Sequence, residues 1–232
     1  MPTSVGFRIY GNKKSTVPQE LLEGFRGIPT SNINDEMNRM YNMSAAISPV
    51  NPVGTMIGTA FTVKVPIGDN LMIHKAMDMI EPGQVLIVDG AGAVDRSLAG
   101  EIMMTFLEKK GVAGVVIDGA MRDIDALSQM KMPIYCKAIT PQGPYKNGPG
   151  EIGVPVCCGG LVVFPGDIII GDPDGIVVIR PEEAPEILAA AQKKHKGEEV
   201  LLARYHTTGP DYEEHAADIE IQLAAKGVTC VH

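Results

Sequence analysis

The first half of the chain alternates between strand-like and helical hydrophobic patterns. Residues 60–65 alternate between apolar and polar side chains, which predicts a strand with one buried face. Residues 70–80 carry apolar side chains at helical spacing, and residues 85–88 form a short continuous apolar run. A helix from about residue 100 to 110 and an apolar run over residues 112–117 repeat this order. Two helix-then-strand units in succession predict parallel strands covered on both faces.

Two polar segments follow the predicted buried strands, where open parallel sheets bind their ligands. Gly90-Ala-Gly92-Ala-Val-Asp95 is similar to the start of a dinucleotide-binding loop. Asp95, however, stands where the third glycine belongs, and its charge would repel a pyrophosphate. We therefore interpret residues 90–95 as a loop that requires small residues, and exclude NAD and S-adenosylmethionine as ligands. The second segment, after residue 117, is a predicted tight turn, Asp118-Gly-Ala-Met, followed by Arg122-Asp123.

The second half of the chain predicts further strands and a helical tail. Residues 133–138, 160–164 and 167–170 are strand-like, and Gly171-Asp-Pro-Asp-Gly175 predicts a hairpin turn into residues 176–179. Helices are expected at about residues 182–205 and 211–226. We expect one domain over residues 1–232, with its core at about 30–180 and a C-terminal helical tail at about 182–226. Such a long tail is expected to pack on a neighbouring subunit.

Charge and hydropathy narrow the classes of function. The formal net charge is −8, and no basic patch suited to nucleic acid stands out. An acidic enzyme of anionic substrates needs a cation in its site, either a metal ion or a buried arginine. No apolar run reaches the ~18 residues that span a bilayer, and residues 1–8 do not resemble a signal peptide. We therefore expect a cytoplasmic protein without a membrane or nucleic-acid partner.

Arg122 and Asp123 are the strongest candidates for chemistry. Both directly follow a buried strand, where they mark either a solvated helix start or a binding site. An aspartate is favourable at a helix N-terminus on electrostatic grounds alone, whereas an arginine is unfavourable there. The pair therefore favours a site, and its residue types suit an anionic ligand bound beside a cation.

The helix that starts at Gly100 adds a second candidate group. A glycine at a helix N-terminus leaves the backbone N–H groups of Gly100, Glu101, Ile102 and Met103 accessible to a carboxylate. Together with Arg122 they would form a clamp for an α-keto acid, with the amides on the carboxylate and the guanidinium on the keto oxygen. His74 is interpreted as a structural residue hydrogen-bonded beside Asn70 and Asp78; a metal-ligand or proton-relay role is the alternative.

In combination, several motifs resemble the RraA-like aldolase family, over about residues 30 to 180. They are Asn70-Leu-Met-Ile-His74, Pro82-Gly83-Gln-Val-Leu-Ile-Val-Asp89-Gly90, Gly111-Val-Ala-Gly-Val-Val-Ile-Asp-Gly119, Met121-Arg-Asp123 and Gly171-Asp-Pro-Asp-Gly175. The family includes the regulator of ribonuclease activity A and the aldolases for 4-hydroxy-4-methyl-2-oxoglutarate and 4-carboxy-4-hydroxy-2-oxoadipate. The resemblance implies an α/β fold, a layered α/β/β/α swivelling-domain sandwich, assembled as a homotrimer or homohexamer with the active site between subunits.

The resemblance also assigns roles to residues. The family motif is an acid followed about twenty residues later by Arg-Asp; here Glu101 holds the acidic position, usually an aspartate. The resemblance implies that Asp123 binds Mg²⁺ or Mn²⁺, largely with waters, and that Arg122 contacts the keto oxygen. The amides of residues 100–103 would hold the pyruvyl carboxylate. Aldolase members carry a further acid three residues after the aspartate, where this chain has Ala126, with Asp125 one position earlier.

The predicted reaction is cleavage of a 4-hydroxy-2-oxo acid to release pyruvate. No lysine in the sequence pattern suits a Schiff base, so a divalent metal and Arg122 are expected to stabilise the pyruvate enolate. The base is expected to be a metal-bound water, steered by Glu198 or Glu199 of a neighbouring chain. Oxaloacetate decarboxylation forms the same enolate and is expected as a side activity. The alternatives are a non-catalytic regulator of ribonuclease activity and a related lyase for another keto or sugar acid.

Overall fold

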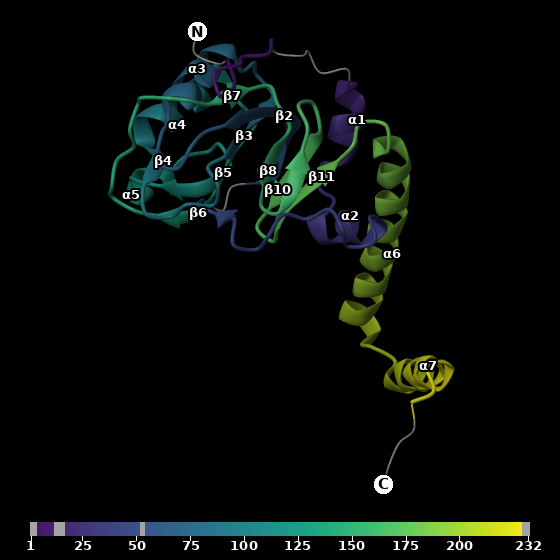
Figure 1. Ribbon diagram of the computed structural model, residues 1–232. Helices are drawn as coiled ribbons and strands as arrows, with labels where there is room; N and C mark the ends of the chain where they lie inside the picture. Colours follow the sequence, from purple (N-terminus) through teal and green to yellow (C-terminus); the bar gives the residue numbers. More distant parts are fainter. Residues whose placement is uncertain (1–3, 12–16, 52–53, 229–232) are drawn as a thin grey trace. The chain divides into compact units, whose positions relative to one another are not determined.

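A computed structural model describes residues 4–11, 17–51 and 54–228 of the chain. Its contacts divide the chain into two compact units, Met1–Gln192 and Lys193–His232. The first unit holds every strand among the described residues (Figure 1).

The first unit is built on one mixed sheet. Its parallel part consists of β2, β3, β5 and β6, and the antiparallel hairpin β10–β11 joins the edge of β2. The path through the sheet is β1-β6-β5-β3-β2-β10-β11, with β4 paired to β5 and β7 to β2; β8 and β9 form a separate ribbon. The strands are β1 Ser48–Pro49, β2 Met56–Lys64, β3 Gln84–Asp89, β4 Ser97–Ala99, β5 Gly114–Met121, β6 Ile134–Ile139, β7 Glu151–Ile152, β8 Val156–Cys158, β9 Leu161–Val163, β10 Ile168–Asp172 and β11 Gly175–Ile179.

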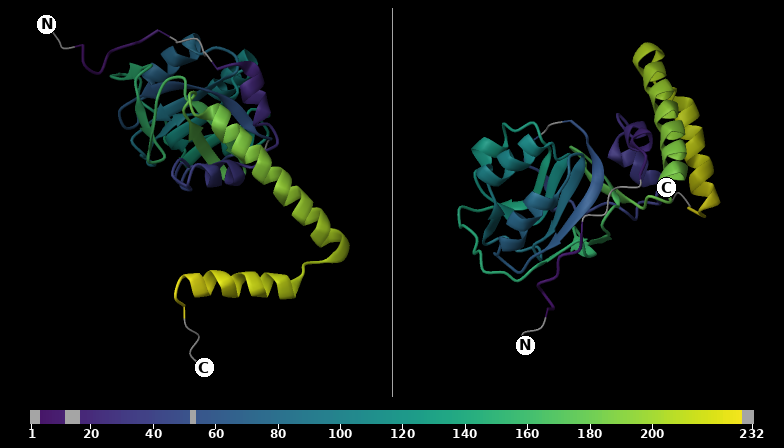
Figure 2. Two further views of the ribbon diagram at one scale, coloured as in Figure 1. Left: turned by 90° about the vertical axis from the view of Figure 1, so that its right-hand side faces the viewer. Right: turned by 90° about the horizontal axis from the view of Figure 1, so that it is seen from above.

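Three hydrophobic cores separate four layers of this unit. The first lies between the parallel strands and the helices α3 Leu71–Met79, α4 Glu101–Lys110 and α5 Ile124–Leu127. The second lies between the opposite face of these strands and the layer of β8 to β11. The third lies between β10–β11 and the helices α1 Gln19–Gly24 and α2 Thr30–Glu36. Figures 1 and 2 show α3 and α4 on one side of the sheet and α1 and α2 on the other. The predicted α/β/β/α sandwich is therefore confirmed.

Several elements match the sequence analysis in type and position. The helix expected at 100–110 is α4, which begins after Gly100 and ends at Gly111, whose φ of 81° is left-handed. The predicted apolar stripe of α3 is buried, and the Asp69 carboxylate accepts a hydrogen bond from Leu71 N at 3.0 Å at its start. The hairpin predicted at 171–175 joins β10 to β11. The tail helices are α6 Ala184–Thr208 and α7 Tyr212–Ala225, close to their predicted bounds.

Two expectations about the strands are wrong. Strand β2 is buried on both faces, because a second layer covers the side expected in solvent; Thr62 is fully buried and donates a hydrogen bond to Val154 O at 2.6 Å. The segment Asp118–Met121 is not a tight turn but the end of β5. The short strand β4, which no pattern indicated, pairs with these last residues and extends β5.

The second unit contains the end of α6 and all of α7. Asp211 caps α7 by accepting a hydrogen bond from Glu214 N at 3.0 Å, and Arg204 on α6 pairs with Glu214 on α7, also at 3.0 Å. No residue of α7 is buried, and apolar side chains such as Ile221 remain exposed. Among the described residues, no helix has both the length and the apolar character that a membrane crossing requires.

Candidate functional site

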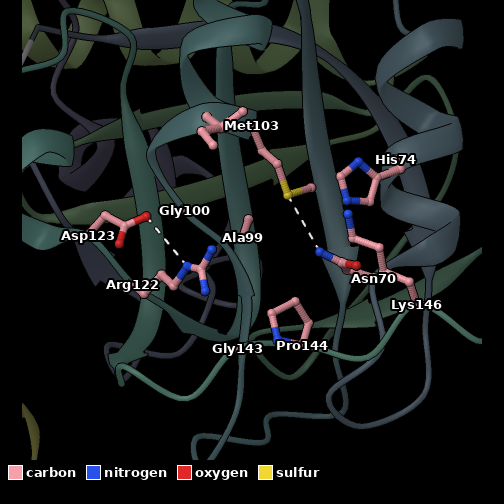
Figure 3. Close-up of a pocket in the computed structure, with 11 residues that line it drawn as sticks. Asn70, His74, Ala99, Gly100, Met103, Arg122, Asp123, Gly143, Pro144 and Lys146 are labelled. Atoms are coloured by element: carbon pink, nitrogen blue, oxygen red, sulfur yellow. Dashed lines mark hydrogen bonds and ion pairs between the residues drawn. The ribbon is translucent and has the colours of Figure 1, made fainter.

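Arg122 and Asp123 lie where two pockets meet, at the carboxyl end of β5. The first pocket has a volume of about 270 Å³ and is lined on its other sides by α3, the start of α4 and residues 143–146 (Figure 3). The second has a volume of about 510 Å³ and lies on the side of α5 and residues 139–141. A site was predicted at this position, and the structure places Gly100–Met103 beside the Arg-Asp pair there.

The Asp123 carboxylate is held against the N-terminus of α4. The backbone of Asp123 is left-handed, with φ 64° and ψ 41°, a conformation that aspartate tolerates better than most residues. Oδ2 accepts a hydrogen bond from Glu101 N at 3.0 Å. Gly100 makes this approach possible, because a Cβ there would overlap Asp123 Oδ2 and lie 2.9 Å from Arg122 Cγ. The glycine thus creates the space in which both functional side chains lie.

The Arg122 guanidinium points into the first pocket, toward the middle of its lining residues (Figure 3). Its backbone N–H donates to Ala99 O at 3.1 Å, which ties the residue to β4. The side-chain Nε lies 3.5 Å from Asp123 Oδ2, and a Cβ at Gly143 would lie 3.0 Å from Nη1. The guanidinium therefore keeps N–H groups available for a ligand in this pocket.

The amides at the start of α4 are not all equivalent. Glu101 N is already bonded to Asp123, so it is not available to a ligand carboxylate in this arrangement. Ile102 N and Met103 N lie in the first turn, where a helix offers no intrahelical acceptor, and both residues line the first pocket. The Ile102 side chain is 84% exposed beside this polar pocket.

Asn70, His74 and Lys146 form the opposite end of the first pocket (Figure 3). Asn70 Nδ2 donates to Leu98 O at 2.9 Å and contacts Met103 Sδ at 3.6 Å. Asn70 Oδ1 and His74 Nε2 are buried and have no hydrogen-bond partner among the described residues. Burial lowers the pKa of His74, and the charge of Lys146 lowers it further, while Asp78 has a smaller opposing effect. The imidazole is therefore neutral at neutral pH.

Lys146 is a pocket residue that the sequence analysis missed. It belongs to a loop rich in glycine and proline, where no periodic pattern indicates which side chain turns inward. No lysine was expected to suit a Schiff base, whereas the structure places Lys146 at the pocket. Its side chain is exposed to solvent.

The second pocket has the opposite charge and suits a divalent cation. Glu101, Asp123 and Asp125 line it, and all three are exposed, so their oxygens are available to a hard cation such as Mg²⁺. Ala126 also lines it, at the position where the family pattern has an acid. Within the described ranges, no group of three or more His, Cys, Asp or Glu is arranged to hold a metal. The carboxylates of this pocket could hold a cation through one or two oxygens, with water completing its shell.

Glu198 and Glu199, the expected candidates for steering the base, belong to the second unit. Glu199 pairs with His195 at 3.7 Å, and Glu198 pairs with Lys194 at the same distance. Within this chain the two carboxylates are thus engaged with neighbours on α6, and their relation to Arg122 is not defined.

Comparison with known proteins places this site in a family. The sequence profile of the RraA-like family, described as Aldolase/RraA, matches residues 30–178. A Halalkalibacterium halodurans protein named "Putative 4-hydroxy-4-methyl-2-oxoglutarate aldolase" is 39% identical over 180 residues, covering 78% of this chain and 86% of the relative. The 4-hydroxy-4-methyl-2-oxoglutarate aldolase of Thermus thermophilus is 36% identical over 111 residues, covering 48% of this chain and 68% of the relative.

A solved structure, described as the RNA-processing inhibitor RraA from Thermus thermophilus, superimposes with a TM-score of 0.61 at 29% identity. It covers 66% of this chain and 92% of the inhibitor. The family match spans more than half of the chain and includes the Arg-Asp pair, the start of α4 and the loop that carries Lys146. The chain therefore belongs to the RraA-like family.

Proposed function

We propose that the protein is a divalent-metal-dependent aldolase that cleaves a 4-hydroxy-2-oxo acid and releases pyruvate. The observation that carries this proposal is the position of Arg122 and Asp123 between a pocket with cationic side chains and a pocket lined by carboxylates. An anionic keto acid fits the first pocket and a divalent cation the second, so that both meet at the Arg-Asp pair. The relatives named as 4-hydroxy-4-methyl-2-oxoglutarate aldolases support the same reaction.

In the proposed complex, the chain holds the pyruvyl end of the substrate at the start of α4. The substrate carboxylate accepts hydrogen bonds from Ile102 N and Met103 N, and Arg122 donates to the keto oxygen. The C4 hydroxyl loses its proton, the C3–C4 bond breaks, and its electron pair moves into the C2 carbonyl. The C4 carbon leaves as a carbonyl, and the enolate of pyruvate takes a proton at C3. Arg122 stabilises the negative charge on the enolate oxygen, a placement typically worth about 3–4 kcal/mol.

The cation is proposed to bind at Asp123, with Glu101 and Asp125 near enough to bind its waters. When bound, Mg²⁺ or Mn²⁺ supplies a second positive charge for the oxygen that becomes negative. The N–H of Glu101 orients the Asp123 carboxylate, which would bind the cation. The other carboxylates of the pocket attract the cation electrostatically.

A Schiff base on Lys146 is the competing mechanism for the same cleavage. Nucleophilic lysines of this kind lie in desolvated pockets, whereas Lys146 is exposed to solvent. The acidic pocket at Asp123 also has no role in a Schiff-base mechanism, and the metal-dependent route is therefore favoured.

The proposed assembly is a homotrimer or homohexamer with the site at a subunit boundary. Ile102, Ile124 and Ile139 expose 84, 39 and 43% of their surface around the two pockets. Apolar side chains gathered around a polar site are typical of an interface. In this arrangement Glu198 or Glu199 of a neighbouring copy steers the water that removes the C4 hydroxyl proton.

The test is a pyruvate assay coupled to lactate dehydrogenase, with Mg²⁺ and either 4-hydroxy-4-methyl-2-oxoglutarate or oxaloacetate. We expect pyruvate from both substrates, because decarboxylation of oxaloacetate also places an electron pair on the C2 carbonyl. Arg122→Ala should remove most activity while metal binding persists, and Asp123→Ala should abolish metal-dependent turnover.

Two controls separate the competing mechanisms. EDTA should stop the reaction, and borohydride added with pyruvate should not inactivate the protein irreversibly. Cleavage that resists EDTA, or a reduced pyruvyl adduct on Lys146 found by mass spectrometry, would refute the metal-dependent mechanism.

A second candidate function is inhibition of a ribonuclease through protein–protein binding. The likeness to the RNA-processing inhibitor and the replacement of the family acid by Ala126 favour it. A wild-type protein that releases no pyruvate with either metal, but slows RNA cleavage by a purified endoribonuclease, would support this alternative.

A further inference from the structure

We propose that Lys146 determines substrate specificity by binding the second carboxylate of the keto acid, and that Asn70 and His74 position its ammonium group. The inference rests on the proposed function, because it assumes that Arg122 and the start of α4 take the pyruvyl end. That placement leaves the opposite end of the pocket for whatever is attached at C4. Lys146 is the cation at that end (Figure 3).

The loop that carries Lys146 is anchored on both sides. Asn70 N donates to Tyr145 O at 3.0 Å, and Tyr145 N donates to Gly68 O at 2.8 Å. On the other side of the lysine, Asn147 N and Gly148 N donate to the Asp69 carboxylate at 2.7 and 3.1 Å. The backbone of Lys146 is therefore tied to the N-terminus of α3, which also presents Asn70 and His74.

Arg96 braces the start of the same loop. Its Nη1 donates to Gly143 O at 2.5 Å, and its guanidinium lies 4.2 Å from the centroid of the Tyr145 ring. Ser97 N donates to Gln142 O at 2.8 Å. A loop held by this many bonds costs little entropy to order when a ligand binds, which is what a recognition lysine requires.

Asn70 Oδ1 and His74 Nε2 are the two buried polar atoms without partners at this end of the pocket. Buried polar atoms rarely remain unpaired, because each costs free energy unless a donor is supplied. In Figure 3 the end of Lys146 lies beside both side chains. An ammonium carries three N–H groups, so it can donate to Asn70 and to neutral His74 and still direct one N–H into the pocket.

A carboxylate is the group that this end of the pocket selects. Lys146 forms no ion pair with a carboxylate of the chain's described part, so its charge is available to a ligand. A methyl or hydroxymethyl group at the same place would leave the ammonium without an anionic partner. The wild-type protein should therefore prefer diacids over monoacids of the same length.

The experiment measures binding separately from turnover. Calorimetric titration with Mg²⁺ present uses 2-oxoglutarate, which carries the second carboxylate but no C4 hydroxyl, and 2-oxopentanoate, which has a methyl group in its place. Wild type should bind the diacid about 10- to 100-fold more tightly, the range expected for one hydrogen bond to a charged group. Lys146→Met should abolish this preference and leave 2-oxopentanoate binding unchanged, and Lys146→Arg should retain most of it.

His74 is tested by rescue with a conservative variant. His74→Leu removes the acceptor and should lower the diacid preference, whereas His74→Gln keeps an acceptor oxygen and should restore it. Loss of the diacid preference should also appear as a higher KM of Lys146→Met for 4-hydroxy-4-methyl-2-oxoglutarate, with little change in kcat. The proposal would be overturned if the wild type and Lys146→Met both bound 2-oxoglutarate and 2-oxopentanoate with equal affinity. A diacid preference without pyruvate release would instead contradict the proposed aldolase and leave Lys146 as the carboxylate-binding residue.

Discussion

At the scale of single residues, the site depends on one position without a side chain. Gly100 has an extended backbone, so no left-handed conformation requires glycine there; the requirement is space. Any Cβ at Gly100 would occupy the volume where Asp123 meets the α4 amide and where Arg122 passes. One methyl group added at Gly100 would therefore change the placement of the Arg122 guanidinium relative to the Asp123 carboxylate. The chemistry of the site depends on that placement.

Gly100→Ala is expected to reduce turnover by about 100-fold or more, because displacing a reacting group by roughly 1 Å has an effect of that size. The circular dichroism spectrum should remain that of the wild type, since only the site must shift. Gly11→Ala is the matched control: a Cβ at Gly11 meets nothing within 4 Å, and activity should be unchanged. Wild-type turnover in Gly100→Ala would show that the two side chains do not act where the structure places them.

At the scale of elements, β3 connects two cores. Leu86 faces the core beneath α3 and α4, whereas Ile87 faces the core shared with the β8–β11 layer, and both are fully buried. The strand has no solvent face because both sides of the sheet are covered. Such a strand anchors its carboxyl end rigidly, and β5, which leads to Arg122, pairs with it in parallel over residues 114–118.

Leu86→Ala and Ile87→Ala are each expected to lower the free energy of unfolding by about 2–5 kcal/mol, because each leaves a cavity in a packed core. Val162→Ala, at an exposed position of strand β9, should change it by no more than about 0.5 kcal/mol. Urea denaturation at one protein concentration measures all three variants. If Leu86→Ala is destabilised but Ile87→Ala is not, the second core is not a packed layer.

At the scale of the whole molecule, the second unit exposes apolar side chains that need a partner. Leu202 on α6 and Ile221 on α7 expose 53 and 68% of their surface, and α7 buries no residue in the single chain. Helices of this kind gain most of their stability from packing against other elements. We infer that other copies of the chain cover these residues in the proposed trimer or hexamer.

Light scattering after size-exclusion chromatography should therefore give a mass of three or six times the chain mass of 24.7 kDa. The double variant Leu202→Asp, Ile221→Asp should shift the protein to smaller species, because it places charges where apolar contact is expected. Gln222→Asp adds one charge at an exposed position of α7 and should leave the mass unchanged. A wild-type protein that elutes as a monomer would contradict the proposed assembly.

The sequence alone determined the elements with strong local patterns and the residues directly attached to them. The stripe of α3, the helix after Gly100, the hairpin at 171–175 and the Arg122-Asp123 pair follow from period, turn chemistry and position after a buried strand. These features are local, so a single stretch of sequence contains all the information that specifies them.

Tertiary structure alone decided which surfaces are covered and which distant side chains meet. Thr62 is buried because β10 and β11 fold back as a second layer, and β5 extends to Met121 because β4 pairs with it. Lys146 lines one pocket with Asn70 and His74 because Asp69 and Arg96 hold its loop against α3 and β4. Such contacts join residues from about 20 to about 115 positions apart, and no local period of hydrophobicity records them.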